Sequence, residues 1–142
     1  MSHFALQELK NDDRDAAFAA TRASTSSWPR GVFEDRQAFD RWVGTEGVVV
    51  HTIVQDAVIV GVAAAMDREG DREILLAVTP EAGDDAATEA LRLLTTHEPE
   101  RPLYACVAAE DEPSHAMLAR IGFVEDRRHA DDVVYVLPPT LE

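Results

Sequence analysis

The feature of the sequence that most restricts the fold is a short apolar run followed by a turn and a helical pattern, within residues 73–94. The run Ile74–Val78 is apolar throughout, which is typical of a strand covered on both faces. After a turn that contains Pro80 and Gly83, small and apolar residues recur at the spacing of one buried helix face. These residues are Ala87, Ala90, Leu91 and Leu94. A buried strand that leads directly into an amphipathic helix predicts an α/β domain.

The turn of this unit admits two interpretations. The first-turn N–H groups of a helix have no partners inside the helix, and the helix dipole is positive there, so the turn could hold an anion. Asp84 and Asp85 also stand at the start of the helix, where an aspartate side chain can accept hydrogen bonds from the same N–H groups. Helix capping is the commoner role of such a turn, and the stretch by itself leaves both roles open.

The composition of the chain indicates one soluble domain with a strongly acidic surface. With 142 residues, of which 46% are hydrophobic, the chain can form a single core, and we expect one domain over residues 1–142. Its net charge of −14 would repel nucleic acid and anionic membranes, and it would favour a cationic substrate such as an amine or a basic peptide. The same charge also suits solubility or a salt-rich cytoplasm, so it does not identify the substrate.

The sequence lacks the patterns typical of a metal site, a disulfide or a membrane anchor. Cys106 is the only cysteine, and the histidines are scattered without the spacing of metal ligands. The longest apolar run, Ala57–Met66, is about half as long as the ~20 residues that a membrane helix needs. The N-terminus lacks the basic and apolar regions of a signal peptide. We therefore expect a cytoplasmic protein.

The whole chain alternates between strand-like and helix-like segments in a distinct order. The expected strands cover residues 4–9, 48–54, 58–66, 72–78, 103–108, 123–126 and 133–137. The expected helices run from about 11 to 23, 35 to 44, 84 to 97 and 111 to 121, with Asn11, Asp12 and Asp35 as caps. The order β-α-α-β-β-β-α-β-α-β-β predicts a mixed, mostly antiparallel sheet with helices on both faces. Because a helix crosses over between them, the strands at 72–78 and 103–108 should be parallel neighbours.

Near the C-terminus, the stretch Ala109–Val124 reads Ala-Glu-Asp-Glu-Pro-Ser-His-Ala-Met-Leu-Ala-Arg-Ile-Gly-Phe-Val. It resembles the closing motif of the GCN5-related N-acetyltransferases (GNAT), in which Asn-x-x-Ser precedes a short helix that ends in Lys/Arg-Leu-Gly-Phe. The run Arg120–Phe123 is the most specific part of this resemblance. Because the order of elements also matches the family, the resemblance covers nearly the whole chain. In style the chain is similar to the compact bacterial enzymes that acetylate ribosomal-protein N-termini.

The resemblance implies that acetyl-CoA binds at the strand–turn–helix unit. The family's pyrophosphate turn usually reads Gln/Arg-x-x-Gly-x-Gly/Ala, whereas the same positions here read Ala82-Gly83-Asp84-Asp85-Ala86-Ala87. Asp85 stands in place of a glycine, and its carboxylate would repel a pyrophosphate. Asp111 replaces the asparagine, and Leu118 replaces a common tyrosine. The cofactor-binding residues implied by the resemblance are Leu76, Ala77, Val78, Gly83, Asp84, Asp85, Ala86, Ala87, Thr88 and Asp111.

The resemblance also suggests residues for the chemistry and for the acceptor. Ser114 matches a serine that is proposed to protonate the leaving thiolate, with a helix-capping hydroxyl as the alternative. Glu73 could accept the proton of the amine, although an exposed charge at a strand end is the commoner role of such a residue. The loop that forms one wall of the family's acceptor site contains Trp28, Arg30 and Phe33. Its two aromatic residues could instead close the core.

These residues support two main functional hypotheses. In the first, the protein is an enzyme that transfers an acetyl group from acetyl-CoA to an amine, either a small molecule or a protein N-terminus. In the alternative, the altered turn has lost tight CoA binding, and the protein is a binding or assembly module. A small-ligand sensor that uses the same cleft is a third hypothesis. The acceptor and the oligomeric state stay open, a homodimer included.

Overall fold

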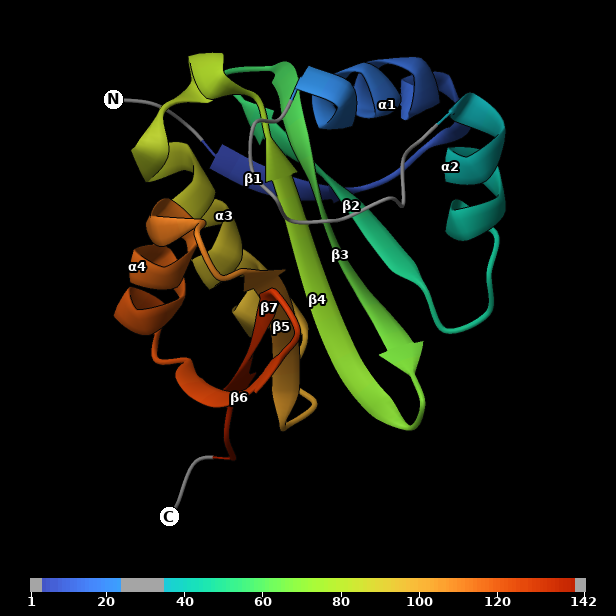
Figure 1. The fold of residues 1–142 in the computed structure, drawn as a ribbon. Helices are drawn as coiled ribbons and strands as arrows, with labels where there is room; N and C mark the ends of the chain where they lie inside the picture. Colours follow the sequence, from blue (N-terminus) through green and yellow to red (C-terminus); the bar gives the residue numbers. More distant parts are fainter. Residues whose placement is uncertain (1–3, 24–34, 140–142) are drawn as a thin grey trace.

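The computed structural model describes residues 4–23 and 35–139, which form one seven-stranded sheet (Figure 1). The strands lie in the spatial order β1-β2-β3-β4-β5-β7-β6. Every neighbouring pair is antiparallel except β4 and β5, so the expectation of a mixed, mostly antiparallel sheet is confirmed. The strands are β1 (Phe4–Glu8), β2 (Val49–Gln55), β3 (Val58–Arg68), β4 (Asp71–Val78), β5 (Leu103–Ala108), β6 (Val124–His129) and β7 (Asp132–Leu137).

Helices cover both faces of the sheet, as the order of elements predicts. Figure 1 shows α1 and α2 on one side of the central strands, and α3 and α4 on the other. No helix in the described ranges is long and apolar enough to cross a membrane. The α-helices are α1 (Arg14–Ala23), α2 (Arg36–Val43), α3 (Asp84–His97) and α4 (Glu112–Ile121), and the short 3-10 helices are η1 (Asn11–Asp13) and η2 (Pro80–Ala82).

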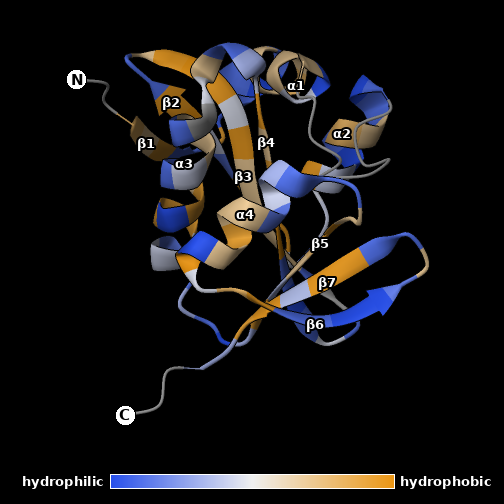
Figure 2. Cartoon of the chain, turned by 60° about the vertical axis from the view of Figure 1, so that its left-hand side comes forward, coloured by the Kyte–Doolittle hydropathy of each residue, from blue (hydrophilic) through white to orange (hydrophobic). Residues whose placement is uncertain are grey.

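The central strands form the core because helices bury both of their faces. In β4, Ile74 and Leu76 point to one face and Leu75 and Ala77 to the other, and each is at most 3% exposed. The hydropathy colours of Figure 2 show the same central band of apolar strands. A strand between two helical layers needs apolar residues at every position, which explains why this run does not alternate with polar residues.

Aromatic rings and an ion pair fix α2 to α1. Phe39 of α2 is fully buried, and its ring centroid lies 5.6 Å from that of Phe18 and 6.2 Å from that of Trp42. Arg36 of α2 also pairs with Asp15 of α1. Trp42 packs against the core, as its helical spacing predicts.

The first two helices begin in different ways, and only one begins as predicted. Asp35 caps α2, since its Oδ1 accepts a hydrogen bond from the Ala38 N–H at 2.8 Å. Asn11 and Asp12 do not cap α1, so that expectation is wrong. They lie inside η1, whose N-cap position is Lys10. Because this 3-10 turn runs straight into α1, the helical segment still starts at the predicted place.

The strand β6 is longer than the sequence suggests. The pattern predicts a strand over 123–126 and a turn over 127–131, whereas β6 continues to His129 and turns at Ala130, which has φ 55°. All six residues of β6 are exposed, and Figure 2 shows the strand as largely hydrophilic. Without a buried face β6 has no apolar alternation, and only its pairing with β7 defines it. Charged side chains on such an edge strand also hinder pairing with other chains.

The strands β4 and β5 are parallel neighbours, as the crossover helix predicts, but they pair over a very short length. The register contains Arg72 opposite Leu103 and Glu73 opposite Tyr104, and it stops there. On its other side β4 pairs with β3 from Asp71 to Val78. Because β4 stays with β3 after it leaves β5, the sheet opens into a wedge toward the C-terminal end of β4.

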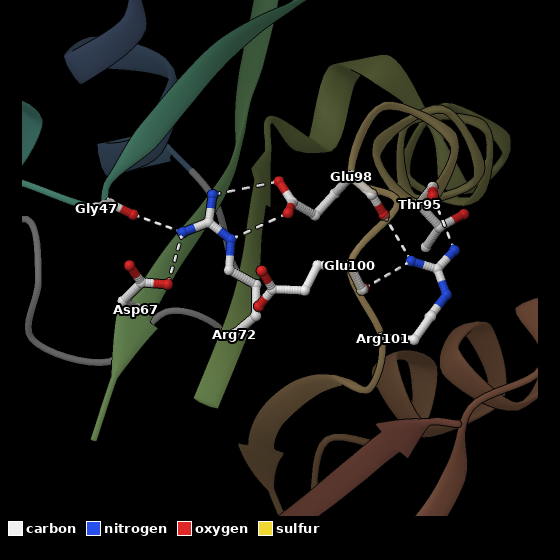
Figure 3. A network of polar contacts seen from close by, with 7 residues as sticks. All are labelled: Gly47, Asp67, Arg72, Thr95, Glu98, Glu100 and Arg101. Carbon is white, nitrogen blue, oxygen red and sulfur yellow. Dashed lines mark hydrogen bonds and ion pairs between the residues drawn. The ribbon is translucent and has the colours of Figure 1, made fainter. Parts of the chain in front are cut away.

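A buried arginine holds the end of α3 at the closed end of this wedge (Figure 3). The Nε and Nη2 atoms of Arg72 donate to the two carboxylate oxygens of Glu98 at 3.1 and 3.2 Å. Its Nη1 donates to Asp67 at 3.0 Å and to the Gly47 carbonyl at 2.6 Å. The Arg72 side chain is only 10% exposed, so these bonds replace the water that it loses. They join α3, the β3–β4 hairpin and the segment before β2.

A histidine pair lies near this network. His51 of β2 packs its ring 5.5 Å from that of His97 at the end of α3. Burial of the ring and the neighbouring His97 lower the pKa of His51 below its ordinary value of 6.5, against the opposite effect of Glu8 and Glu98. Protonation of His51 is therefore harder in the folded chain than in the unfolded chain.

This difference predicts that acid destabilises the fold through His51. Above the ordinary pKa both states are neutral, so the group does not affect stability. As the pH falls below about 6.5, the unfolded chain takes up a proton that the folded chain resists, and the free energy of unfolding decreases. Urea unfolding of wild type and His51→Gln between roughly pH 7.5 and pH 5.5 measures this contribution as the difference between their slopes. The exposed His129→Gln is the control, and equal slopes for wild type and His51→Gln would contradict the prediction.

Candidate functional site

The wedge between β4 and β5 contains a cleft of about 390 Å³. One wall is the C-terminal end of β4 with the turn into α3, and the other is one face of α4 from its N-cap to Arg120. The cleft is therefore at the place where the sequence predicts the cofactor. It is lined by Leu76, Val78, Thr79, Pro80, Gly83, Ala87, Thr88, Asp111, Pro113, Ser114, Ala116, Met117 and Arg120.

The backbone of β4 turns a donor and an acceptor toward the cleft at Val78. The Thr79 N–H donates to the Val60 carbonyl at 2.8 Å, so it points to β3. Residues along a strand alternate the edge to which their N–H and C=O groups point. The N–H and C=O of Val78 therefore point away from β3, into the wedge that β5 has left open. Polar groups there can bind a ligand in place of a neighbouring strand.

A glycine in β3 allows this arrangement. β3 has a register irregularity beside Val60, and Gly61 lies opposite Val78. A Cβ added to Gly61 would overlap the carbonyl oxygen of Ala77 and lie 3.0 Å from the Cα of Val78. Only glycine permits so close an approach of the two backbones. The end of β4 is thus fixed by β3 while its other edge remains exposed to the cleft.

The turn into α3 presents the start of a helix to the cleft. Gly83 occupies the N-cap position with φ 88° and ψ 165°, a conformation that favours glycine, and an added Cβ would meet nothing within 4 Å. The N-cap position is thus Gly83, and not an aspartate as that interpretation of the turn suggests. The first-turn N–H groups lack partners within the helix, so they can bind an anion beside Gly83.

The other predicted residues of this turn differ in their positions. Ala87 and Thr88 line the cleft, whereas Ala86 is fully buried in the core. Asp85 is exposed and does not line the cleft, and Ala77 is buried with its carbonyl toward β3. Of α3, the cleft is lined by the adjacent residues Ala87 and Thr88. An anion in the cleft would therefore meet the charge of Asp85 through solvent rather than by direct contact.

The first turn of α4 brings two predicted residues together. Asp111 is the N-cap, and its carboxylate accepts hydrogen bonds from the Ser114 N–H at 3.4 Å and from the Ser114 hydroxyl at 2.7 Å. Ser114 is 4% exposed and lines the cleft with Asp111. The nearby carboxylate disfavours a negative charge on the serine oxygen. Ser114 thus keeps its hydroxyl proton, which it shares with Asp111 in this structure, and the cap itself is Asp111.

Glu73 lies apart from this cluster. It belongs to the last residue pair before β4 and β5 separate. Along β4 it points to the face opposite Leu76 and Val78, because strand side chains alternate. Leu76 and Val78 share their face of β4 with Arg72. This is the α3 side of the sheet, because Arg72 bonds to Glu98 at the end of α3. The two predicted catalytic residues, Glu73 and Ser114, are therefore on opposite sides of the sheet.

Several site features were missing from the sequence-based expectations. Met117 and Arg120 line the cleft at helical spacing from Ser114, so the helical pattern of α4 could have indicated them. Arg120 is the one cationic side chain among the described cleft-lining residues. The predicted acceptor residues Trp28, Arg30 and Phe33 lie outside the described residues. Within 4–23 and 35–139, no group of three or more metal-ligating side chains could hold a metal ion.

Comparison with solved structures shows the same fold in acetyltransferases. A probable GNAT-family acetyltransferase from Chromobacterium violaceum is 22% identical, with a TM-score of 0.75 over 95% of this chain and 87% of that chain. The ribosomal-protein-S18-alanine N-acetyltransferase of Escherichia coli is 15% identical, with a TM-score of 0.72 over 100% and 96%. The Campylobacter jejuni N-acetyltransferase PseH, in complex with acetyl coenzyme A, is 15% identical, with a TM-score of 0.68 over 97% and 100%.

A search of curated proteins found no match to this sequence. A comparison with models of protein families did find one. The family model of the acetyltransferase (GNAT) domain matches residues 3–124, which include the strand–turn–helix unit, the wedge and the Gly-Phe that follows α4. Because this match spans most of the chain and the fold agrees with it, the protein belongs to the GNAT acetyltransferase family.

Proposed function

We propose that the protein transfers an acetyl group from acetyl-CoA to a primary amine in the wedge between β4 and β5. The observation that carries this proposal is the open cleft beside the inward-facing N–H of Val78. Acetyl-CoA would supply an acetyl thioester, which is an activated carbonyl group. The rest of the reaction depends on how the chain holds that carbonyl, the leaving sulfur and the amine.

The walls of the cleft suit the different parts of the donor. The edge of β4 from Leu76 to Val78 can pair with the amide groups of a pantetheine arm, as β5 would have done. The start of α3 at Gly83, with Ala87 and Thr88 on the same side, would hold a diphosphate through backbone N–H groups. Arg120, on the opposite wall, adds a positive charge. The Val78 N–H would stabilise the negative charge that develops on the acetyl oxygen.

The proton movements in the reaction assign roles to two side chains. The neutral amine attacks the carbonyl carbon as a nucleophile and loses one proton after the C–N bond forms. Glu73 would accept that proton directly or through water. When the C–S bond breaks, the sulfur leaves as a thiolate; the Ser114 hydroxyl would turn from Asp111 to donate a hydrogen bond to it, and water would supply the proton that the free thiol takes up. Because Glu73 lies on the α1–α2 face, the amine would approach from that side and the donor from the other.

The acceptor class follows from the charge of the chain and from the neighbours. The name of one structural neighbour gives an alanine of ribosomal protein S18 as its acceptor. A net charge of −14 attracts a cationic amine and disfavours nucleic acid as a partner. We therefore propose a small amine or a basic protein N-terminus as acceptor, in the cytoplasm. A homodimer is a further proposal, which sedimentation would test.

The alternative function, a module that has lost CoA binding, is less well supported. One part of its support was a carboxylate of Asp85 facing the pyrophosphate, whereas Asp85 is exposed and outside the cleft lining. Its other support, Ala82 in place of the usual Gln or Arg, stands. Calorimetric titration with acetyl-CoA and with CoA tests the two functions directly. We expect both ligands to bind, and we expect acetylated product by mass spectrometry when basic amines or peptides are added. Absence of binding at millimolar ligand would reject the enzyme and favour the module.

Removal of the Ser114 hydroxyl should slow the chemical step. We expect Ser114→Ala to lower kcat on the order of 10²-fold, because the leaving sulfur loses its hydrogen-bond donor. CoA affinity measured by calorimetry should change little, since Asp111 still caps α4. Ser114→Thr keeps the hydroxyl and serves as the matched control. If Ser114→Ala turns over as fast as wild type, the hydroxyl only supports the first turn of α4.

Removal of the Asp85 charge should tighten donor binding by a small factor. Asp85→Asn keeps the size of the side chain but removes a negative charge from the first turn of α3, where a diphosphate would bind. We expect CoA to bind about two- to fivefold more tightly at low salt, and the gain to shrink as salt screens the charge. The exposed Glu46→Gln makes the same change in net charge far from the cleft. An equal gain in Glu46→Gln would show that overall charge, rather than this turn, limits binding.

A further inference from the structure

We propose that His115 is a positioning residue that holds the α4 wall of the cleft against β5 and β7. Its Nε2 lies 3.0 Å from the carbonyl oxygens of both Ala108 and Ala109, where β5 ends. Its Nδ1 lies 2.6 Å from the hydroxyl oxygen of Tyr135 in β7. This histidine is not among the site residues that the sequence predicts, and the proposal rests on the function proposed above for the cleft.

The three contacts define how the histidine bonds. Carbonyl oxygens can only accept, so Nε2 carries the hydrogen and is shared between Ala108 and Ala109. In the neutral ring Nδ1 is then an acceptor, and the Tyr135 hydroxyl donates to it. Burial raises the pKa of Tyr135, with Glu125 next in effect, so the hydroxyl keeps its proton. Tyr135 is 8% exposed, and its ring lies 5.4 Å from that of His115.

The position of His115 in α4 connects these bonds to the cleft. It follows Ser114 directly and lies one helical turn after Asp111, whose carbonyl accepts its N–H at 3.2 Å. Ala108 and Ala109 begin the short segment that leads from β5 to the Asp111 cap. The side chain of His115 therefore braces both ends of the turn that carries the Asp111–Ser114 pair. A shift of this turn would move the Ser114 hydroxyl relative to the sulfur.

The wedge explains why such a brace is needed. Backbone pairing between β4 and β5 stops at Glu73 and Tyr104, so at the open end β4 and α4 are not held together by the sheet. The α4 wall must be fixed from its other side, by β5 and β7. Loss of a single hydrogen bond changes stability modestly, but catalysis is sensitive to displacements of about 1 Å. The brace should therefore affect turnover more than it affects folding.

The experiment compares variants that remove or keep the hydrogen bonds. Tyr135→Phe removes only the hydroxyl, and His115→Phe removes the ring nitrogens. His115→Gln is the conservative rescue, because its amide can donate to a carbonyl and accept from Tyr135. Thr95→Val is the matched control, since it removes a buried hydroxyl that donates to the Arg92 carbonyl at 2.8 Å in α3, away from the cleft.

Two measurements are made on each full-length variant. In hydrogen–deuterium exchange, we expect residues 111–117 to exchange about fivefold faster or more in Tyr135→Phe and His115→Phe, with α3 unchanged. In steady-state kinetics with acetyl-CoA, we expect kcat to fall about tenfold or more, while the KM for the acceptor stays within about twofold. His115→Gln should recover most of both effects, and Thr95→Val should show neither.

The two measurements separate the outcomes. Unchanged exchange of residues 111–117 in both His115→Phe and Tyr135→Phe overturns the proposal, whether or not the protein is active. If His115→Gln behaves like His115→Phe, the ring acts by packing and the hydrogen-bonding role is wrong. A loss of kcat in Thr95→Val equal to that in Tyr135→Phe assigns the effect to general stability and also overturns it. A wild type that acetylates no amine rejects the proposed function, while faster exchange in the two variants would still support the brace.

Discussion

The short pairing between β4 and β5 is the constraint on which the rest of the structure depends. Only Arg72–Leu103 and Glu73–Tyr104 are in register, and beyond them β4 follows β3. The polar edge that β4 exposes would be costly inside a protein without a partner, so it is placed where a ligand or water can reach it. The crossover helix α3 begins at the open end of the wedge and returns to the closed end, where Arg72 holds the residue that follows it. The cleft, the helix start and the arginine network are therefore parts of one arrangement.

The charges of the chain are distributed in a way that suits this arrangement. Most of the acidic surplus lies on exposed positions, while the described cleft lining has one carboxylate, Asp111, and one cationic side chain, Arg120. Asp111 is occupied by the Ser114 hydroxyl and by the first turn of α4. Because this carboxylate accepts hydrogen bonds at the start of α4, it would repel the negatively charged acetyl-CoA less strongly. The first turn of α4 combines three tasks: the cap, the cleft wall and the attachment to β5 and β7.

Local sequence patterns predicted the elements well and the contacts between them poorly. The apolar run Ile74–Val78 was enough to predict a strand buried on both faces, and the helix after it was enough to predict a parallel neighbour. Asp35 marked the start of α2 because the chemistry of a cap is local. β6 was predicted too short, since an exposed strand has no apolar alternation. The length of the β4–β5 pairing and the bonds of His115 depend on residues that are distant in the sequence, and no local pattern contains them.

The wedge also has a mechanical consequence. Four strands, β1 to β4, and three strands, β5 to β7, form two stiff plates that backbone hydrogen bonds join only at one end. Arg72 and Glu98 tie that end together, so a change in the angle between the plates would open or narrow the far end. A molecule that bonds to both plates there would complete the missing part of the sheet. Its binding energy would then be shared with the cohesion of the two plates, and the chain would unfold as a more cooperative unit when the cleft is filled.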